Sequence, residues 1–317
     1  MPMDADARRW LADVTFGRVR FDEPMSLHTS LRVGGPAEAF VEPKAADELA
    51  ALVSGLAGRE IPYHVVGGGT NLIVTEAGIS GVVICLKPGL SEILIENTSV
   101  SQARVTVMAG TSLRLLCSHV IQKGLKGMSF ALGIPGTVGG AIRMNAGTAL
   151  GWISDVLESV TVLYPDGQRE KIGRKALCFS YRKLMLPQIS RGKSLSYETT
   201  IMSGSFSLVR ASSTELKQEA REILKNRKRR QPTTLPSAGC VFKNPLTGKT
   251  AGELIDLCGL KGQKIGGAEI SVKHANFIVN TGSATAADIL TLMDIVRQTV
   301  FDRYQVNLEP EVIVIGN

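Results

Sequence analysis

Three features are scarce in this 317-residue chain: aromatic side chains, which make up 5%, paired cysteines, and long uncharged apolar runs. A membrane span takes about 20 consecutive, mostly apolar residues, and no window of the sequence approaches that length. The opening residues, MPMDADARRW, also lack the basic segment and apolar run of a secretory signal. We therefore expect a soluble, cytoplasmic protein without a membrane partner.

The cysteines exclude two common kinds of site. They are odd in number, widely scattered and contain no CxxC pair: Cys85, Cys117, Cys178, Cys240 and Cys258. Disulfide frameworks use even numbers of cysteines, and zinc sites use close pairs. We expect reduced thiols and no metal site. On general grounds a lone cysteine is a small buried apolar residue.

Positive charge is in excess. The formal net charge is +7 and the isoelectric point is about 9.2, which favours anionic partners. The densest basic run, Lys225 to Arg230, follows a predicted helix in which Ser212 and Glu215 are spaced as a capping box. The run is either a solvated helix end, a phosphate-binding segment or a nucleic-acid patch. Because no aromatic residues are interleaved with its charges, we expect no nucleic-acid partner.

The apolar pattern predicts a mixed α+β protein, long enough at 317 residues for two or three domains. Short β-rich runs fill the first third. Beyond them the pattern predicts helices over 111–125 and 284–304, a hairpin over 156–172 with its turn at Tyr164 to Gly167, and strands over 205–209 and 308–316. The capped helix at Ser212 predicts the start of a C-terminal domain.

Two glycine clusters lie in the first half, VVGGGTNLIV and GIPGTVGGAIRMNAGT. Glycine permits positive φ and lets a ligand approach the main chain, whose successive amides can hold phosphate. Neither cluster is a Rossmann fingerprint or a P-loop, since the second reads GxxGxxGG and no GK[ST] follows. Each alone is compatible with a structural turn. Together they favour a ligand, and both suit a pyrophosphate.

These segments resemble the UDP-N-acetylenolpyruvoylglucosamine reductase (MurB) family. The likeness continues through FSYRK, PSAGCVFKNP, AGELIDLCGLKG, GGAEISVKHANFIVN and LEPEVIVIG, and covers nearly the whole chain from TSLRVGG onward. It implies an α+β fold with a FAD-binding domain of the vanillyl-alcohol-oxidase type in two subdomains, 1–90 and 91–210, followed by a substrate-binding domain, 211–317. The implied activity is reduction of the enolpyruvyl ether of UDP-N-acetylglucosamine to UDP-N-acetylmuramate in peptidoglycan synthesis, with bound FAD and with NADPH as co-substrate.

The resemblance also implies roles for single residues. Arg182 matches the arginine that contacts the substrate carboxylate, Glu311 the glutamate that stabilises the enol-type intermediate, and Cys240 the proton donor. Substrate binding falls to Tyr181, Arg230 and Asn244. The flavin diphosphate is expected on the main chain of the two clusters, with the cofactor-binding residues Gly67, Gly68, Gly69, Thr70, Asn71, Gly133, Ile134, Pro135, Gly136, Thr137, Gly139, Gly140 and Asn145.

The chain departs from the family at two positions, Cys240 and Ile313. Cys240 stands where many members carry serine, and a thiol, with an ordinary pKa of about 8.5, can still donate a proton at neutral pH. Ile313 stands where an arginine is usual, which weakens any expectation of salt bridges around Glu311. Three further residues of the motif VKHANF either hold the nucleotide or order the loop: Lys273, His274 and Asn276.

Several expectations remain open. The stretch after YRKLML leaves little room for the tyrosine-bearing loop of one subclass, so the chain resembles the loop-lacking subclass (type II). We expect a monomer.

One rival function is a FAD-dependent sugar or alcohol oxidase, in which a histidine is often attached to the flavin, but the four histidines lie outside the glycine clusters. The other rival is a nucleic-acid-binding protein built around the basic run.

Overall fold

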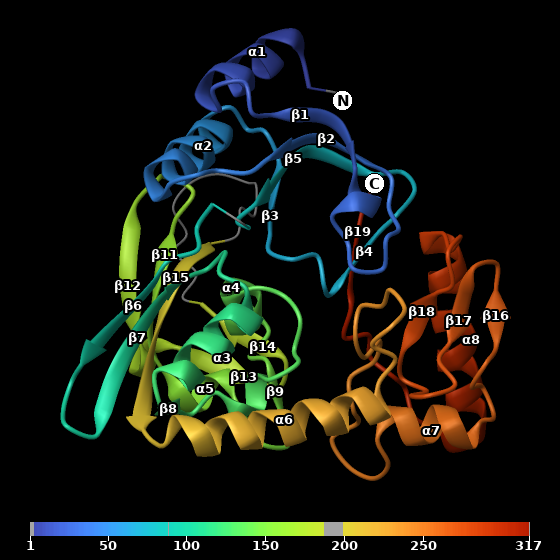
Figure 1. Cartoon of the computed structure of the whole chain (residues 1–317). Helices are drawn as coiled ribbons and strands as arrows, with labels where there is room; N and C mark the ends of the chain where they lie inside the picture. The colour runs from blue at the N-terminus through green and yellow to red at the C-terminus, as the bar shows by residue number, and fades with distance from the viewer. Residues whose placement is uncertain (1–2, 88, 187–198, 317) are drawn as a thin grey trace. The chain divides into compact units, whose positions relative to one another are not determined.

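The computed structural model describes residues 3–87, 89–186 and 199–316. The chain forms two compact units (Figure 1), and each combines separate parts of the sequence. Unit 1 comprises Met1–Phe21, Glu38–Gly68 and Gly81–Lys225, and unit 2 comprises Asp22–Ala37, Gly69–Ser80 and Asn226–Asn317. Two segments from the N-terminal third therefore belong to the same unit as the C-terminus. The division into 1–90, 91–210 and 211–317 stays a prediction.

The first sheet accounts for the short β-rich runs near the N-terminus, and its strands include residues of both units. Its strands lie in the order β1 (Arg20–Pro24), β2 (Pro36–Val41), β5 (Ile79–Cys85) and β3 (Tyr63–Val66). Two helices belong to the same part of the chain, α1 (Ala5–Val14) and α2 (Ala46–Gly58), and α2 buries leucines and a valine at helical spacing. β3 and β5 are parallel. β3 ends at Val66, so Gly67 is the first residue after its carboxyl end.

The second sheet of unit 1 contains the predicted hairpin. Its strands lie in the order β12 (Arg169–Gly173), β11 (Leu157–Leu163), β15 (Thr200–Arg210), β7 (Gln102–Met108) and β6 (Ile93–Asn97), and β8 (Leu125–Lys126) also pairs with β15. β11 and β12 are antiparallel, and the Gly167 N–H donates to the Tyr164 carbonyl across the turn at 2.9 Å. Three helices belong to this region: α3 (Leu113–Gln122), which confirms the helix predicted over 111–125, α4 (Val138–Arg143) and α5 (Ile153–Val156).

Short elements carry the segments around the predicted arginine. They are η2 (Ser129–Ala131), β9 (Gly147–Thr148), β10 (Gly151–Trp152), η3 (Arg174–Ala176), β13 (Cys178–Ser180) and β14 (Lys183–Met185). The expectation that Cys178 is buried is wrong, whereas Cys85, Cys117 and Cys258 are buried. β13 and β14 form a two-stranded hairpin, and strand alternation turns Phe179 toward the core and Cys178 outward.

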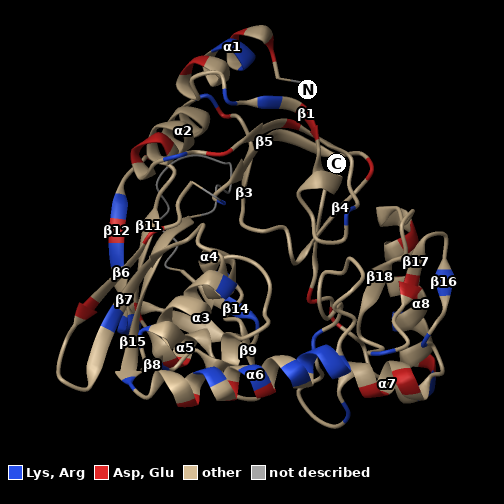
Figure 2. Cartoon of the chain, viewed as in Figure 1, with Lys and Arg blue, Asp and Glu red and all other residues tan. Residues whose placement is uncertain are grey.

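Helix α6 (Ser213–Arg230) is longer than the sequence pattern indicates. Its start is as predicted, since the Glu215 N–H donates to Ser212 Oγ at 3.4 Å. The basic run was expected after the helix but forms its last turns. Figure 2 shows these blue residues concentrated in the second half of α6.

Unit 2 has a core of its own. A three-stranded sheet, β16 (Lys264–Ile265), β17 (Ala268–Ile270) and β18 (Ile278–Asn280), packs against α8 (Ala286–Tyr304), and α7 (Ala251–Leu257) also contacts α8 (Figure 1). The helix predicted over 284–304 is confirmed as α8, and its apolar residues at helical spacing face the core, with Ile289, Met293, Val296 and Val300 buried and Leu290 partly buried. η1 (Met25–Leu27) belongs to this unit, as does a parallel pair of β4 (Leu72–Val74) and β19 (Ile313–Ile315). That pair joins the segment after the first glycine cluster to the last strand.

Within 3–87, 89–186 and 199–316, no helix has the length and apolar character needed to cross a bilayer. Within the same ranges, no three His, Cys, Asp or Glu side chains are grouped as a metal site requires. Part of the stretch behind the loop-lacking subclass prediction, 187–198, lies outside the described residues.

Candidate active site

The two predicted glycine clusters touch in unit 1. A methyl group placed on Gly67 would overlap with Thr137 Oγ1, so only bare backbone fits there. Thr137 is 3% exposed and precedes α4, and its Oγ1 accepts the Gly140 N–H at 3.4 Å. A methyl group on Gly139 would lie 2.8 Å from the Ala109 Cβ. Two sequence-distant segments thus meet where the Gly67 backbone lies against the Thr137 side chain, which is the arrangement that one shared ligand needs.

The second cluster uses some of its amides internally. The N–H groups of Val138 and Gly139 donate to the carbonyls of Thr111 and Ala109, each at 2.9 Å, and are therefore not available to a diphosphate. The tip of the loop is different. Its residues Gly133 and Pro135 are exposed, and Gly133 and Gly136 have φ of +79° and +107°, which side chains disfavour. Exposed, side-chain-free backbone of this kind fits a bound diphosphate.

Arg182 lies in a cluster of unit 1 that we call the arginine cluster: Asn145, Gly147, Trp152, Tyr181 and Arg182. Its Nη1 donates to the Gly147 carbonyl at 3.1 Å, and its guanidinium lies 5.3 Å from the Trp152 ring centroid and 5.2 Å from that of Tyr181. Arg182 has φ of +59°, a strained conformation for a non-glycine residue. Such strain concentrates at functional sites.

Asn145 connects the two segments of this cluster. Its side chain is 6% exposed; Nδ2 donates to the Ser180 carbonyl at 3.2 Å, and Oδ1 accepts the Ser154 N–H at 3.1 Å. The amide therefore ties the chain just before Arg182 to the chain just after Trp152. The cofactor-binding role of Asn145 stays a prediction.

Unit 2 brings three other predicted residues together: Asn71, Cys240 and Glu311. We call the paired segments 240–243 and 309–311 the Cys240 ladder. The Glu311 N–H donates to the Val241 carbonyl at 2.7 Å, and the Lys243 N–H donates to the Glu309 carbonyl at 2.9 Å. Asn71 Nδ2 donates to the Glu311 carbonyl at 2.9 Å, across 240 positions of sequence. The predicted thiol and carboxylate thus belong to adjacent backbone segments.

Asn276 is a buried residue that holds one segment of this ladder, Val241 and Phe242, through hydrogen bonds. It is 2% exposed, its Oδ1 accepts the Phe242 N–H at 2.9 Å, and its Nδ2 donates to the Phe242 carbonyl at 2.8 Å. Its own carbonyl accepts the Val241 N–H at 2.9 Å. Of the two interpretations left open by the sequence, Asn276 matches the ordering of the loop.

Asn276→Ala is expected to lower the free energy of unfolding by about 3 kcal/mol, because two backbone groups of Phe242 lose their partners in a buried place. Urea denaturation measures this loss. The exposed Asn307 provides a control, and Asn307→Ala should change stability by less than about 0.5 kcal/mol. Equal stability of the two variants would contradict the role given to Asn276.

The other two residues of the motif have different surroundings. Lys273 Nζ donates to the Lys228 carbonyl near the end of α6 at 2.7 Å, where a cation complements the helix dipole. His274 packs edge-on against Phe277 with ring centroids 4.8 Å apart. Burial and the nearby Lys261 cation lower the pKa of His274, so its neutral form is favoured.

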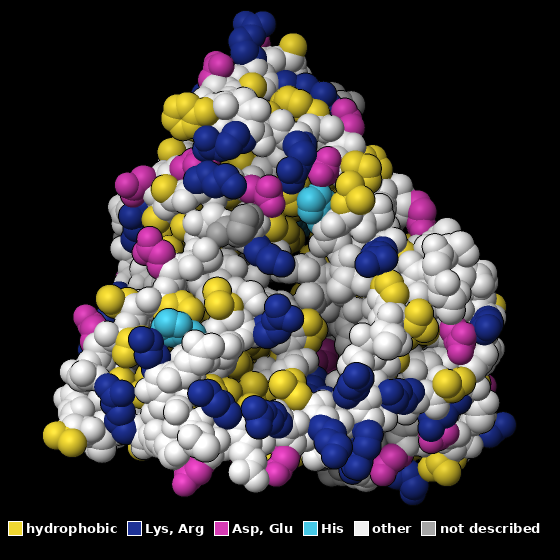
Figure 3. Space-filling model, viewed as in Figure 1, with side chains coloured by type: hydrophobic (Ala, Val, Ile, Leu, Met, Phe, Trp, Pro, Cys, Tyr) yellow, Lys and Arg dark blue, Asp and Glu magenta, His cyan; other side chains and the backbone are white. Residues whose placement is uncertain are grey.

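Arg227 is a cation that the sequence reasoning missed. The predicted substrate residue Arg230 is exposed, whereas Arg227 is half-buried. Burial lowers the pKa of Arg227 and the charge of Cys240 opposes this, which indicates that thiol and guanidinium interact. Helical spacing was the available signal, because Arg227 continues the inward face of α6 formed by Leu216, Ala220 and Ile223. Figure 3 shows the Lys and Arg side chains gathered over α6.

The remaining predicted substrate residues divide between the units. Tyr181 belongs to the arginine cluster of unit 1, and its ring meets Trp152 edge-on with centroids 5.8 Å apart. Asn244 is exposed, directly after the Cys240 ladder in unit 2. Its Oδ1 accepts the Ala251 N–H at the start of α7 at 3.1 Å.

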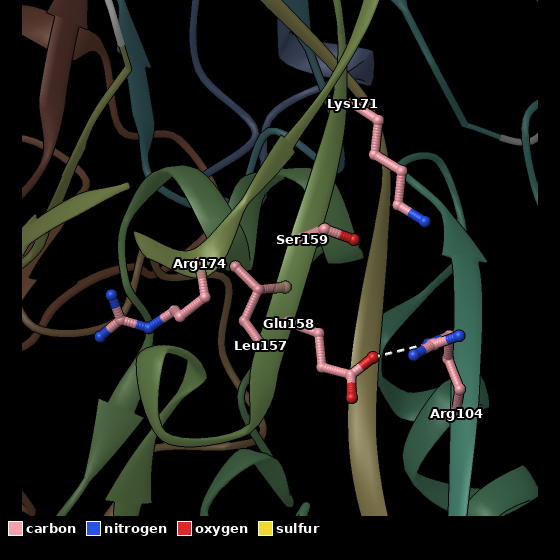
Figure 4. Close-up of a pocket in the computed structure, with 6 residues that line it drawn as sticks. All are labelled: Arg104, Leu157, Glu158, Ser159, Lys171 and Arg174. Atoms are coloured by element: carbon pink, nitrogen blue, oxygen red, sulfur yellow. Dashed lines mark hydrogen bonds and ion pairs between the residues drawn. The ribbon is translucent and has the colours of Figure 1, made fainter. Parts of the chain in front are cut away.

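A separate pocket lies on the second sheet of unit 1 and is lined by Arg104, Leu157, Glu158, Ser159, Lys171 and Arg174 (Figure 4). Arg104 Nε pairs with Glu158 Oε2 at 2.6 Å. Arg174 points away from this pair, and its guanidinium lies 4.8 Å from the Phe179 ring centroid. The three cations of the pocket, Arg104, Lys171 and Arg174, do not point toward a common centre (Figure 4). The pocket includes none of the predicted site residues.

Comparison with known proteins covers both halves of the chain. Residues 37–173 match the family described as "FAD binding domain", and residues 231–315 match "UDP-N-acetylenolpyruvoylglucosamine reductase, C-terminal domain". The UDP-N-acetylenolpyruvoylglucosamine reductase of Desulfosudis oleivorans is 45% identical over 99% of this chain and 100% of its own. That of Anoxybacillus flavithermus is 40% identical over 98% of both chains. The crystal structure of MurB from Thermus caldophilus superposes with a TM-score of 0.76 at 37% identity, over 92% of this chain and 97% of that one.

Proposed function

Because this chain belongs to the UDP-N-acetylenolpyruvoylglucosamine reductase family, and is thus an oxidoreductase of peptidoglycan synthesis with a FAD-binding domain, we propose that NADPH is its reductant and Cys240 its proton donor. One observation carries the proposal. Cys240 and Glu311, which the family resemblance assigns to protonation and to stabilisation of the intermediate, lie on the two paired segments of the Cys240 ladder. Asn71, from the first glycine cluster, is bonded to the same ladder.

When bound, FAD supplies the hydride transfer, from NADPH to the terminal carbon of the enolpyruvyl group. That addition leaves negative charge on the adjacent carbon, delocalised into the carboxylate. We assign Arg182 to the carboxylate, since a guanidinium can donate two parallel hydrogen bonds to it. Cys240 then gives its Sγ proton to the adjacent carbon and is left as a thiolate. Glu311, protonated or acting through water, donates a hydrogen bond to the enol-type intermediate.

The surroundings of Cys240 support its assignment. Arg227 is a half-buried cation whose pKa the charge of a Cys240 thiolate raises, so the two opposite charges attract once the proton has been donated. Asn276 fixes the backbone of Val241 and Phe242, the two residues after Cys240, which limits movement of the thiol. Proton donation needs a group held at a constant distance from the reacting carbon.

The glycine contact of unit 1 supports FAD as the bound group and gives a test. Gly67→Ala is expected to lower the FAD content of the purified protein, because the new methyl group would overlap with Thr137 and push the two loops apart. Absorbance at flavin wavelengths per mole of protein measures the loss. Gly173→Ala is the matched control, since nothing lies within 4 Å of its added methyl group. A fully loaded Gly67→Ala protein would show that the contact is irrelevant to the cofactor.

A two-step spectral experiment tests the proposed reaction. Under anaerobic conditions, NADPH should bleach the flavin absorbance of the purified protein, and the enolpyruvyl derivative of UDP-N-acetylglucosamine should restore it. Loss of colour with NADPH but recovery only with oxygen would overturn the proposal in favour of an oxidase. A properly folded protein that takes up no FAD would overturn both.

A further inference from the structure

We propose that Trp152 is a positioning residue for Arg182: its ring, together with the adjacent ring of Tyr181, faces the guanidinium and holds it in position to bind a carboxylate. This inference rests on the substrate role proposed above for Arg182. Trp152 is half-buried, lies in β10 and is one of two tryptophans in the chain.

The strand pairing places the indole beside the arginine. In the short ladder of β9 and β10, Trp152 stands directly opposite Gly147. A methyl group on Gly147 would overlap with the Trp152 ring, so the absence of a side chain lets the indole lie against this strand. The Gly147 carbonyl is the same group that accepts Arg182 Nη1 at 3.1 Å. One glycine therefore admits the ring and anchors the guanidinium.

Three more hydrogen bonds fix the positions of the ring and the arginine. The Trp152 N–H donates to Asp155 Oδ2 at 2.8 Å, which fixes the backbone that carries the indole. Asn145 joins Ser154 to Ser180, and thus the segment of Trp152 to the segment of Arg182. The contact between indole and guanidinium is therefore a consequence of local backbone bonds.

Such a contact matters because an arginine side chain has many rotamers. Ordering it when a ligand binds costs conformational entropy, and a side chain already held against two rings loses less on binding. A cation near an aromatic face is also attracted to it by the negative charge density of the ring. Trp152 and Tyr181 lie next to each other and both rings face the guanidinium, which restricts its position before the substrate arrives.

Substitution of Trp152 tests the inference in the FAD-loaded enzyme. Trp152→Ala should raise KM for the enolpyruvyl substrate about tenfold, the effect of losing one cation–π contact. Flavin reduction by NADPH, which presents no carboxylate at the reacting group, should keep its rate. Trp152→Phe retains an aromatic face and should restore most of the affinity. If Trp152→Phe is as defective as Trp152→Ala, the aromatic contact is not the cause.

The chain offers a matched control elsewhere in unit 1. Arg59 lies 4.1 Å from the Trp10 ring and its Nη1 donates to the Gly55 carbonyl at 3.3 Å, which repeats the pattern around Arg182. Trp10→Ala removes an equivalent ring without touching any residue of the predicted sites. Its KM for the enolpyruvyl substrate should equal that of the unmodified enzyme. A similar increase in both tryptophan variants would point to general destabilisation and overturn the inference.

A double-mutant cycle decides whether Trp152 acts through Arg182. The combination of Trp152→Ala with Arg182→Lys should be no worse than Arg182→Lys alone, because the indole would have no guanidinium left to position. Additive losses would overturn this inference and leave the role of Arg182 intact. If Arg182→Lys itself has no effect on the reaction with the enolpyruvyl substrate, the proposed role of Arg182 fails and this inference fails with it.

Discussion

Cys240→Ala is expected to slow reoxidation of the reduced enzyme by the enolpyruvyl substrate about 10³-fold, within the range that a positioned general acid contributes. Flavin reduction by NADPH should be unaffected, since that step needs no proton from Cys240. The separation is measurable because the two half-reactions are followed one at a time by anaerobic stopped-flow absorbance. Equal reoxidation rates in the variant and the unmodified enzyme would remove Cys240 from the mechanism.

Two controls show whether the effect belongs to proton donation. Cys240→Ser places a hydroxyl, the group that many family members carry, at the same position on the ladder and should retain activity. Cys178→Ala removes the exposed thiol of β13 in unit 1 and should leave both half-reactions unchanged. An inactive Cys240→Ser would mean that this chain depends on a thiol for some other reason.

Arg182→Lys is expected to lower kcat/KM for the enolpyruvyl substrate about 100-fold. A lysine keeps the positive charge but is a point donor, so it cannot make the two parallel hydrogen bonds that a guanidinium makes to a carboxylate. It also loses the planar surface that lies against Trp152 and Tyr181. Steady-state kinetics with the enolpyruvyl substrate varied at saturating NADPH measures the loss.

Arg59→Lys is the matched control for this prediction. Arg59 has the same two kinds of contact, a tryptophan ring and a carbonyl of a nearby glycine, but belongs to the first sheet region of unit 1. Its replacement should leave kcat/KM unchanged. If the two lysine variants are equally active, the guanidinium of Arg182 contributes nothing specific to turnover.

The sequence predicted the fold best where a pattern is local. The hairpin over 156–172, the helix over 111–125 and the buried face of α8 follow from turn residues and periodicity, and the structure confirms each. The prediction was wrong for Cys178, since burial depends on which face of a small hairpin meets the core. The end of α6 was also misjudged. Lysine and arginine are good helix formers, so a basic run continues a helix as readily as it follows one.

The candidate site divides in the same way. The motifs that the sequence analysis singled out include Cys240 and Glu311, but only the folded chain shows that their segments pair, because the pairing joins residues far apart in sequence. Trp152 was missed because several strands and turns separate it from Arg182 in the sequence, and only the folded chain brings the two side chains together. Arg227 was hidden among five other basic or polar neighbours, although helical spacing sets it apart.

The interleaving of the two units has a practical consequence for dissecting this enzyme. Residues 22–37 and 69–80 complete the unit that otherwise begins at 226, and β4 supplies the hydrogen-bonding edge for β19. A fragment starting at 226 would leave its final strand unpaired and would lose the Asn71 amide that holds the Glu311 carbonyl. The C-terminal portion therefore cannot be excised as an autonomous module, and engineers who wish to exchange it between homologues must transplant the two N-terminal pieces along with it.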